Sequence, residues 1–183
     1  MSLADDESVS RIIIDNGATL DLTTKTLMLS SDGTPLVKNG NLITANGTIS
    51  YRGTSAQALT SNVSYGNLTI NNPSGVTVSS DFSVTGILSV ANGDLHLNGY
   101  TITLSGIASS LVETSGNTVS GASGAITTTR NNSQPSSLNI AGLGAVININ
   151  RKSRFNYCHK KTQCSEYKCG RAKLEEAFHY NSA

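Results

Sequence analysis

Two aspartates and one histidine are the residues whose types suggest acid–base chemistry. Asp94 and His96 are separated by one residue, so they share a face if this segment is extended, and Asp81 lies a short distance upstream. Enzymes that cleave glycosidic bonds need paired carboxylates. About twenty residues to either side of Asp94 and His96 the sequence offers mainly Ser, Thr and Asn instead of partner acids. We therefore assign no catalytic residue, expect solvated side chains, and keep a polysaccharide lyase or glycoside hydrolase as the enzymatic alternative.

Metal binding has two sets of candidate ligands. Asp94 with His96 is one set, but zinc needs three or four protein ligands. The other is a C-terminal group of soft ligands, namely Cys158, Cys164, Cys169 and His179. Their spacing, Cys-x5-Cys-x4-Cys-x9-His, lacks the close Cys-x2-Cys pair of zinc fingers. We therefore expect unpaired or accidentally oxidised thiols, and we expect no metal and no other cofactor.

Contact with a sugar is the remaining chemistry that the residue types suggest. Aromatic rings stack on sugars, and Tyr51, Tyr65 and Tyr100 are the available tyrosines. Tyr51 lies at a position that we expect to face the core. The candidate ligand-binding residues are therefore Asp94, His96 and Tyr100.

The elements that must position these residues follow from a repeated apolar pair, in which two apolar residues flank one other residue. The pairs are Leu20/Leu22, Leu27/Leu29, Ile49/Tyr51, Leu68/Ile70, Val76/Val78, Phe82/Val84, Leu88/Val90, Leu95/Leu97 and Ile102/Leu104. Three pairs make one unit, because Leu68 to Leu88 spans 20 positions and Val76 to Leu95 spans 19. A period of this size is typical of repeat architectures, whose short strands bury their apolar faces by stacking.

The expected fold is an all-β, right-handed parallel β-helix (a β-solenoid) of about seven short rungs. Similar side chains that lie one period apart should stack on one another in successive rungs. Ile49, Leu68 and Leu88 should form one column, Val76 and Leu95 another, and Phe82 and Ile102 a third. The alternative is a β-sandwich, because Asn-Gly pairs such as Asn92-Gly93 and Asn98-Gly99 also form type I′ hairpin turns. The short, regular spacing of the pairs favours the β-helix.

Three segments are expected along the chain. Residues 1–10 should be N-terminal linker residues, residues 11–150 the β-helix repeat domain, and residues 151–183 a basic tail outside the repeat. The tail holds 8 of the 13 Lys and Arg but 3 of the 12 acidic residues, so it carries +5 and the rest carries −4. We interpret it as a cap, a separate motif, or non-native sequence from a shifted reading frame or a vector. Residues Arg171 to Tyr180 have a spacing that could form a short helix.

Composition limits the classes of partner. Charged residues make up 14% of the chain, well below the roughly 25% of ordinary soluble domains. A formal net charge of +1 gives no phosphate-binding stripe, so we expect no nucleic acid. No apolar run reaches the ~20 residues that cross a bilayer, so we expect no membrane insertion. Residues 1–10 lack the apolar region of a signal peptide, so we expect any export signal to lie outside this chain.

One stretch adds a family resemblance. The sequence Gly93-Asp-Leu-His-Leu-Asn-Gly-Tyr-Thr-Ile-Thr-Leu-Ser-Gly106, with the segments at Asn39–Leu59 and Tyr65–Ile70, resembles a repeat of large secreted and cell-surface bacterial proteins, the adhesin-like and autotransporter-passenger-like β-helix proteins. The resemblance covers about residues 11–107. It implies a non-enzymatic structural and adhesive module with glycans or other surface polymers as partners. We also expect self-association through the end rungs, which present unpaired backbone groups.

Overall fold

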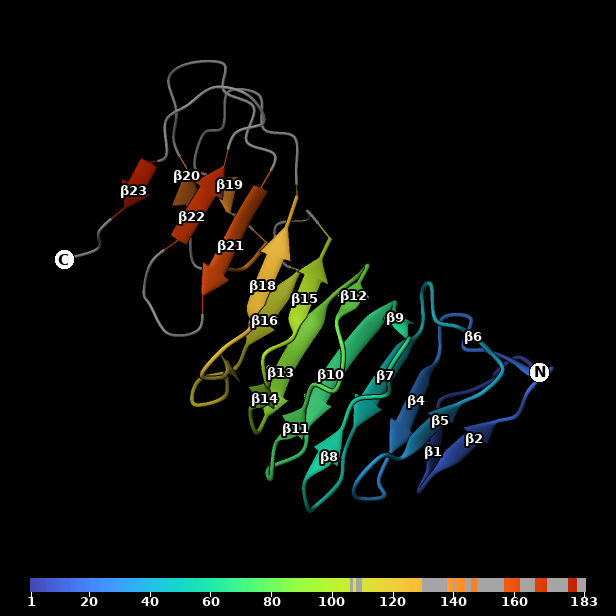
Figure 1. Cartoon of the computed structure of the whole chain (residues 1–183). Coiled ribbons are helices and arrows are strands. Elements are labelled where there is room, and N and C mark those ends of the chain that lie inside the picture. The colour runs from blue at the N-terminus through green and yellow to red at the C-terminus, as the bar shows by residue number, and fades with distance from the viewer. Residues whose placement is uncertain are drawn as a thin grey trace.

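The computed structural model describes residues 1–105, 107, 110–129, 138–139, 141–143, 146–147, 157–161, 167–170 and 178–180. In these ranges every regular element is a β-strand and none is a helix. Strands one period apart pair side by side, and the chain forms a parallel β-solenoid of about six turns (Figure 1). The fold class expected from the repeat is confirmed, with about six turns in place of about seven.

Each full turn places one strand in each of three sheets. The first sheet contains β1 (Glu7–Val9), β4 (Thr26–Leu29), β7 (Thr48–Tyr51), β10 (Asn67–Asn71), β13 (Leu88–Asn92) and β16 (Leu111–Glu113). The second contains β8 (Gln57–Ala58), β11 (Val76–Thr77), β14 (Leu95–His96) and β17 (Val119–Ser120). The third begins with β9 (Ser64–Tyr65), β12 (Phe82–Val84), β15 (Thr101–Leu104) and β18 (Ala125–Thr128).

The register of the strands is the one that the sequence period predicts. Leu68 pairs with Ile49 on one side and with Leu88 on the other. Val76 pairs with Leu95, and Phe82 pairs with Ile102. All of these ladders are parallel, so the β-sandwich alternative is wrong.

The core is a set of aliphatic columns enclosed by the three sheets. Leu27, Ile49, Leu68, Leu88 and Leu111 follow one another in register along the first sheet, and all are buried. Successive side chains of a strand point to opposite faces, so a buried residue alternates with an outward one. Each apolar pair therefore supplies two side chains to the core and leaves the residue between them outside.

The Asn-Gly pairs make corners and not hairpins. Asn98 and Gly99 have positive φ angles of 50° and 88°. They lie between β14 and β15, which belong to the second and third sheets. The left-handed conformation at these positions turns the chain from one sheet to the next. The Asn-Gly pair does mark a tight turn, but the strands on either side of it pair with strands one period away and not with each other.

The solenoid begins within the first ten residues. These residues were expected to be a linker, yet β1 pairs in parallel with β4, and Ser2 bridges Asp21. Leu3 is buried at the end of the core. Two short parallel pairs complete the first turns, β2 (Ile12–Ile14) with β5 (Leu36–Lys38) and β3 (Thr19–Asp21) with β6 (Asn41–Ile43).

Parallel stacking ends at β18 in the described part of the chain. There the third sheet continues with antiparallel strands β21 (Tyr157–Lys161), β22 (Tyr167–Gly170) and β23 (Phe178–Tyr180). Strands β19 (Leu138–Asn139) and β20 (Val146–Ile147) pair antiparallel with each other. The helix expected over residues 171–180 is wrong at its end, where Phe178–Tyr180 is a strand, and residues 171–177 lie outside the described ranges.

The core column makes a prediction about stability. Replacing Leu68 by Ala should lower the free energy of unfolding by about 3 kcal/mol, because Leu68 is fully buried between two neighbours and a cavity would remain. Thr69→Val, on the outward side of the same strand, should change it by less than about 1 kcal/mol. Urea denaturation measures both. Equal effects of the two substitutions would contradict the stacked core.

Candidate functional site

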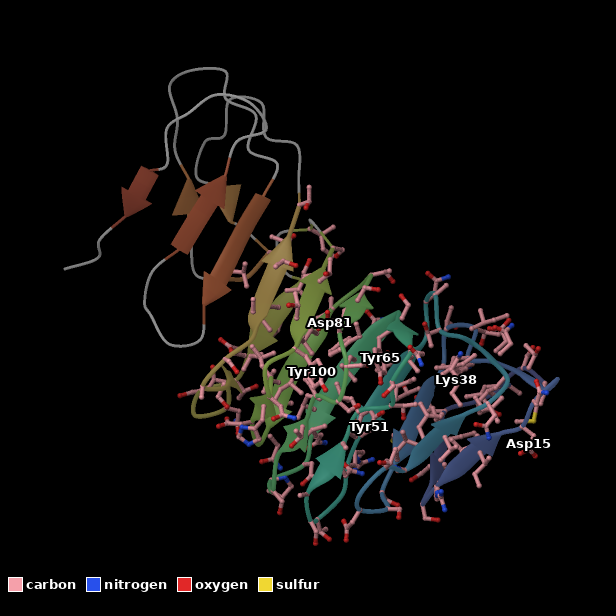
Figure 2. The ribbon with its side chains drawn as sticks, viewed as in Figure 1. Asp15, Lys38, Tyr51, Tyr65, Asp81 and Tyr100 are labelled. Atoms are coloured by element: carbon pink, nitrogen blue, oxygen red, sulfur yellow. The ribbon has the colours of Figure 1, made fainter. Side chains whose placement is uncertain are left out.

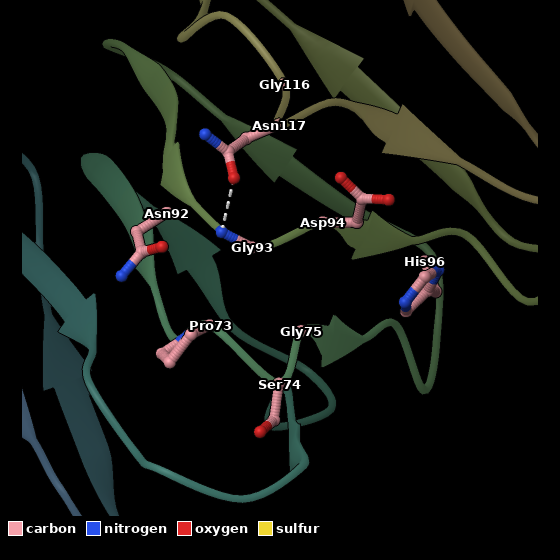
Figure 3. Close-up of a pocket in the computed structure, with 9 residues that line it drawn as sticks. All are labelled: Pro73, Ser74, Gly75, Asn92, Gly93, Asp94, His96, Gly116 and Asn117. Atoms are coloured by element: carbon pink, nitrogen blue, oxygen red, sulfur yellow. Dashed lines mark hydrogen bonds between the residues drawn. The ribbon is translucent and has the colours of Figure 1, made fainter.

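A polar pocket lies at the corner between the first and second sheets (Figure 3). It has a volume of about 310 Å³ and is lined from three successive turns of the solenoid. The lining segments are residues 73–75, residues 92–94 with His96, and residues 116–117. Each segment connects a strand of the first sheet to a strand of the second, so the repeat itself brings them together.

Two glycines form the base of this corner pocket. A Cβ atom on Gly93, whose φ is 77°, would overlap the backbone carbonyl oxygen of Asn72. A Cβ on Gly75, whose φ is 80°, would lie 3.0 Å from the Nε2 atom of His96. Because neither position has a side chain, the neighbouring turns can approach this closely at the pocket.

A buried amide network fixes the first wall of the pocket. The Asn72 Nδ2 donates to Ser55 O at 2.7 Å and to Gln57 Oε1 at 3.0 Å, and its Oδ1 accepts from Ser74 N at 2.9 Å. Gln57 Nε2 in turn donates to the carbonyl oxygens of Leu29 and Ser31. Asn72 and Gln57 are buried, and buried polar groups are stable only when hydrogen-bonded. The network therefore holds the turn at residues 73–75 in one conformation.

One carboxylate oxygen of Asp94 accepts a backbone hydrogen bond that joins two turns. Its Oδ1 accepts a hydrogen bond from Thr118 N, one turn further on, at 2.9 Å. Asp6 accepts the same kind of bond from Thr26 N and Asp81 accepts it from Thr101 N, each at 2.8 Å. The Oδ1 of Asn67 accepts one from Ile87 N at 2.9 Å. Each acceptor lies just before a paired strand or, for Asn67, is its first residue, and each accepts the bond from the equivalent residue of the next turn. These side chains lengthen the ladder by one hydrogen bond.

His96 lies on the outer face of the second sheet and is exposed. Its register neighbours are Thr77 and Ser120, and its Nδ1 lies 2.9 Å from Ser120 Oγ. The neighbours of Asp94 and His96 are thus glycine and hydroxyl residues, as the sequence period predicts. Among the described residues the pocket lining contains a single carboxylate, so these residues do not supply the carboxylate pair that glycoside hydrolysis commonly uses.

The other sequence-predicted residues lie elsewhere. Asp81 is exposed beside the third sheet, and Tyr100 is half-buried against the core, outside the pocket lining (Figure 2). Tyr51 and Tyr65 are fully buried, so neither ring is accessible to a sugar. Of the three candidate ligand-binding residues, Asp94 and His96 line the pocket and Tyr100 does not, and ligand binding by them stays a prediction.

Tyr51 and Tyr65 form a hydrogen-bonded pair inside the core. Their hydroxyl oxygens lie 3.3 Å apart, Thr60 N donates to Tyr51, and Tyr65 donates to Thr60 O. Tyr65 also packs edge-on against Phe82, with ring centroids 5.3 Å apart. Burial raises the pKa of Tyr51 above its ordinary value of 10.0. Burial, followed by the charge that Tyr51 would carry, raises the pKa of Tyr65 well above 10.0.

The C-terminal ligand candidates are only partly within the described residues. Cys158 in β21 is the register partner of Cys169 in β22. His179 in β23 pairs with Lys168, so it does not share a register row with the two cysteines. Cys164 lies outside the described residues. Among the side chains that the structure describes, no three His, Cys, Asp or Glu come together as a metal site.

Sequence reasoning missed Asn92 and Asn117. Asn92 was treated only as part of an Asn-Gly turn and Asn117 was not considered, because a search for partner acids and aromatics passes over amides. Asn117 Oδ1 accepts from Gly93 N at 2.7 Å and joins two turns across the pocket (Figure 3). The sequence period could have revealed both residues, because it places the corner of each turn directly above the corner of the preceding turn.

The strand pairing defines the class of protein, a parallel β-solenoid with a polar pocket at one corner. No protein-family model matches the chain, and no curated protein or solved structure matches it. Within the ranges described above, no helix is long and apolar enough to span a membrane.

The ladder-extending carboxylates predict a small, position-specific effect on stability. Asp81→Ala should lower the free energy of unfolding by about 1 kcal/mol, because Thr101 N loses its acceptor, whereas Asp81→Asn retains an acceptor oxygen and should cost less. Asp15→Ala is a control, since this exposed carboxylate has no side-chain hydrogen bond to the described residues. Chemical denaturation provides the measurement. An Asp15→Ala effect as large as that of Asp81→Ala would refute the assignment.

The buried tyrosine pair predicts loss of stability at alkaline pH. Above pH 10 the unfolded chain releases tyrosine protons that the folded chain retains, so the free energy of unfolding should fall as pH rises, by up to about 1.4 kcal/mol per pH unit for each tyrosine. Tyr65→Phe should make this dependence shallower. Urea midpoints between pH 8 and 11 measure it, and an unchanged slope in the variant would contradict the burial argument.

Proposed function

We propose that this chain is a non-enzymatic structural and adhesive scaffold module of a larger exported bacterial surface protein. The observation that carries the proposal is the composition of its outer rows. The third sheet places Ser64, Ser83, Thr103 and Thr127 in one file. The Oγ atoms of Ser64 and Ser83 lie 2.9 Å apart, and the Oγ1 atoms of Thr103 and Thr127 lie 3.3 Å apart. An uncharged hydroxyl row suits many weak contacts with neutral polymers.

The use of the carboxylates supports a scaffold over an enzyme. Asp81 and Asp94 each bind a backbone N–H of the next turn, so the acids that would serve catalysis contribute to stacking. A carbohydrate-active protein on the same fold remains the second candidate. The corner pocket favours a carbohydrate-binding protein over a carbohydrate-cleaving enzyme, because the described residues of its lining offer hydrogen-bonding groups but no pair of carboxylates.

Secretion or cell-surface localisation belongs to the same proposal. It is supported by the resemblance of the glycine-rich repeats to adhesin-like proteins and by the low content of charge. Self-association is a further part of the proposal. β1 forms one end of the first sheet and has β4 as its neighbour, so its other edge can pair with another chain.

The scaffold proposal predicts a stiff chain without catalytic turnover. Spin labels introduced as encoded amino acids at the outward positions Ser8 and Val112, five ladder steps apart, should give a narrow distance distribution around about 24 Å plus the label length. Pulsed electron resonance measures the distribution. Incubation with pectin, alginate and chondroitin sulfate should release neither reducing ends nor unsaturated sugars. A broad distribution would refute the scaffold, and a released product would favour the enzyme.

A further inference from the structure

We propose that the corner pocket binds a single unit of a neutral sugar through two neighbouring hydroxyl groups, a role that rests on the adhesive part of the proposed function. The pocket joins one carboxylate, one free amide and one imidazole within about 310 Å³. Pocket residues come from three successive turns, so the site exists only when the solenoid is stacked. Asn92, Asp94 and His96 all line the pocket, and Figure 3 shows Asn92 and Asp94 on either side of Gly93, with His96 further along the same segment.

The pocket retains hydrogen-bonding capacity that the fold does not use. Asp94 accepts from Thr118 N through Oδ1, and its Oδ2 has no partner among the described residues. The Asn92 side-chain amide has no hydrogen bond within that same part of the chain. His96 uses Nδ1 with Ser120, which leaves Nε2 available in either tautomer. Together they provide an acceptor for two hydroxyl protons, a donor–acceptor amide and one further ring nitrogen.

This set of groups fits a polyol better than an ion. Calcium takes six to eight oxygen ligands, usually from several carboxylates, and Asp94 is the single carboxylate in the lining. An anion would meet that carboxylate without a lysine or arginine in the lining to offset it. The hydroxyl groups of a sugar need both acceptors and donors, and the lining offers both in the Asp94 carboxylate and the Asn92 amide.

The rigidity of the walls supports a formed site. Asn72 is fully buried and bonds the Ser74 backbone, while Asn117 bonds the Gly93 backbone across the pocket. A preorganised site loses less entropy on binding. The described lining holds no Phe, Tyr or Trp, so a single site should bind with a dissociation constant of about 1 mM, equivalent to about 4 kcal/mol. Repeated modules would add avidity.

The test is a titration of the full chain with methyl glycosides of glucose, galactose, mannose and N-acetylglucosamine, and separately with calcium chloride, followed by nuclear magnetic resonance. At least one glycoside should give saturable shifts of the Asn92 side-chain amide and of the Gly75 and Gly93 backbone amides. Asp94→Asn should weaken binding about tenfold, because a neutral acceptor replaces a charged one. Asp81→Asn is the matched control, since Asp81 makes the same ladder bond outside the pocket.

Three results would overturn the sugar site: no glycoside shifts these resonances, calcium alone shifts them, or the two Asp→Asn variants weaken binding equally. The spectra of both variants report whether the fold is intact, because Asn retains an acceptor for the ladder bond. Failure here leaves the distance measurement on the scaffold unaffected. The two proposals are therefore tested separately.

Discussion

The structure depends on the parallel, in-register pairing of each turn with the next. One set of backbone hydrogen bonds fixes the distance between turns, and that distance brings like side chains into contact. Ile49, Leu68 and Leu88 illustrate the result, because each occupies the same position in its own turn and all are buried. A strand of three to five residues cannot bury an apolar face alone, so the stack forms as a unit.

The same constraint explains why the polar residues lie where they do. Positions that cannot join the core are corners or outward rows, and both are repeated by the stacking. Asp6, Asn67 and Asp81 show that a side-chain oxygen beside a strand can extend the ladder into the corner. At Asp94 one carboxylate oxygen is left without a partner among the described residues, and Gly75 and Gly93 let the neighbouring turns approach closely beside it. The candidate site is thus a consequence of how the turns are joined.

The repeating part of the fold was predictable from the sequence, whereas departures from the repeat were not. The twenty-residue period determined the pairing of Leu68 with Leu88 and of Phe82 with Ile102. It did not reveal that β1 already belongs to the stack, because the acidic residues around it obscure the pattern. The pocket was also missed. It lies where the period is interrupted, by the register shift between Ile70 and Asn71 that pairs Asn71 with Asn92, and by the 24 positions that separate Asp94 from Thr118.

Methyl contacts between turns provide the decisive measurement. In a sample with labelled leucine, isoleucine and valine methyl groups, nuclear Overhauser effects should connect Leu68 with both Ile49 and Leu88, its partners in the neighbouring turns. Antiparallel strands joined by tight turns would instead bring Leu68 close to the next apolar pair in sequence, Val76 and Val78. Cross-peaks to that pair, without any to Leu88, would contradict the stacked solenoid.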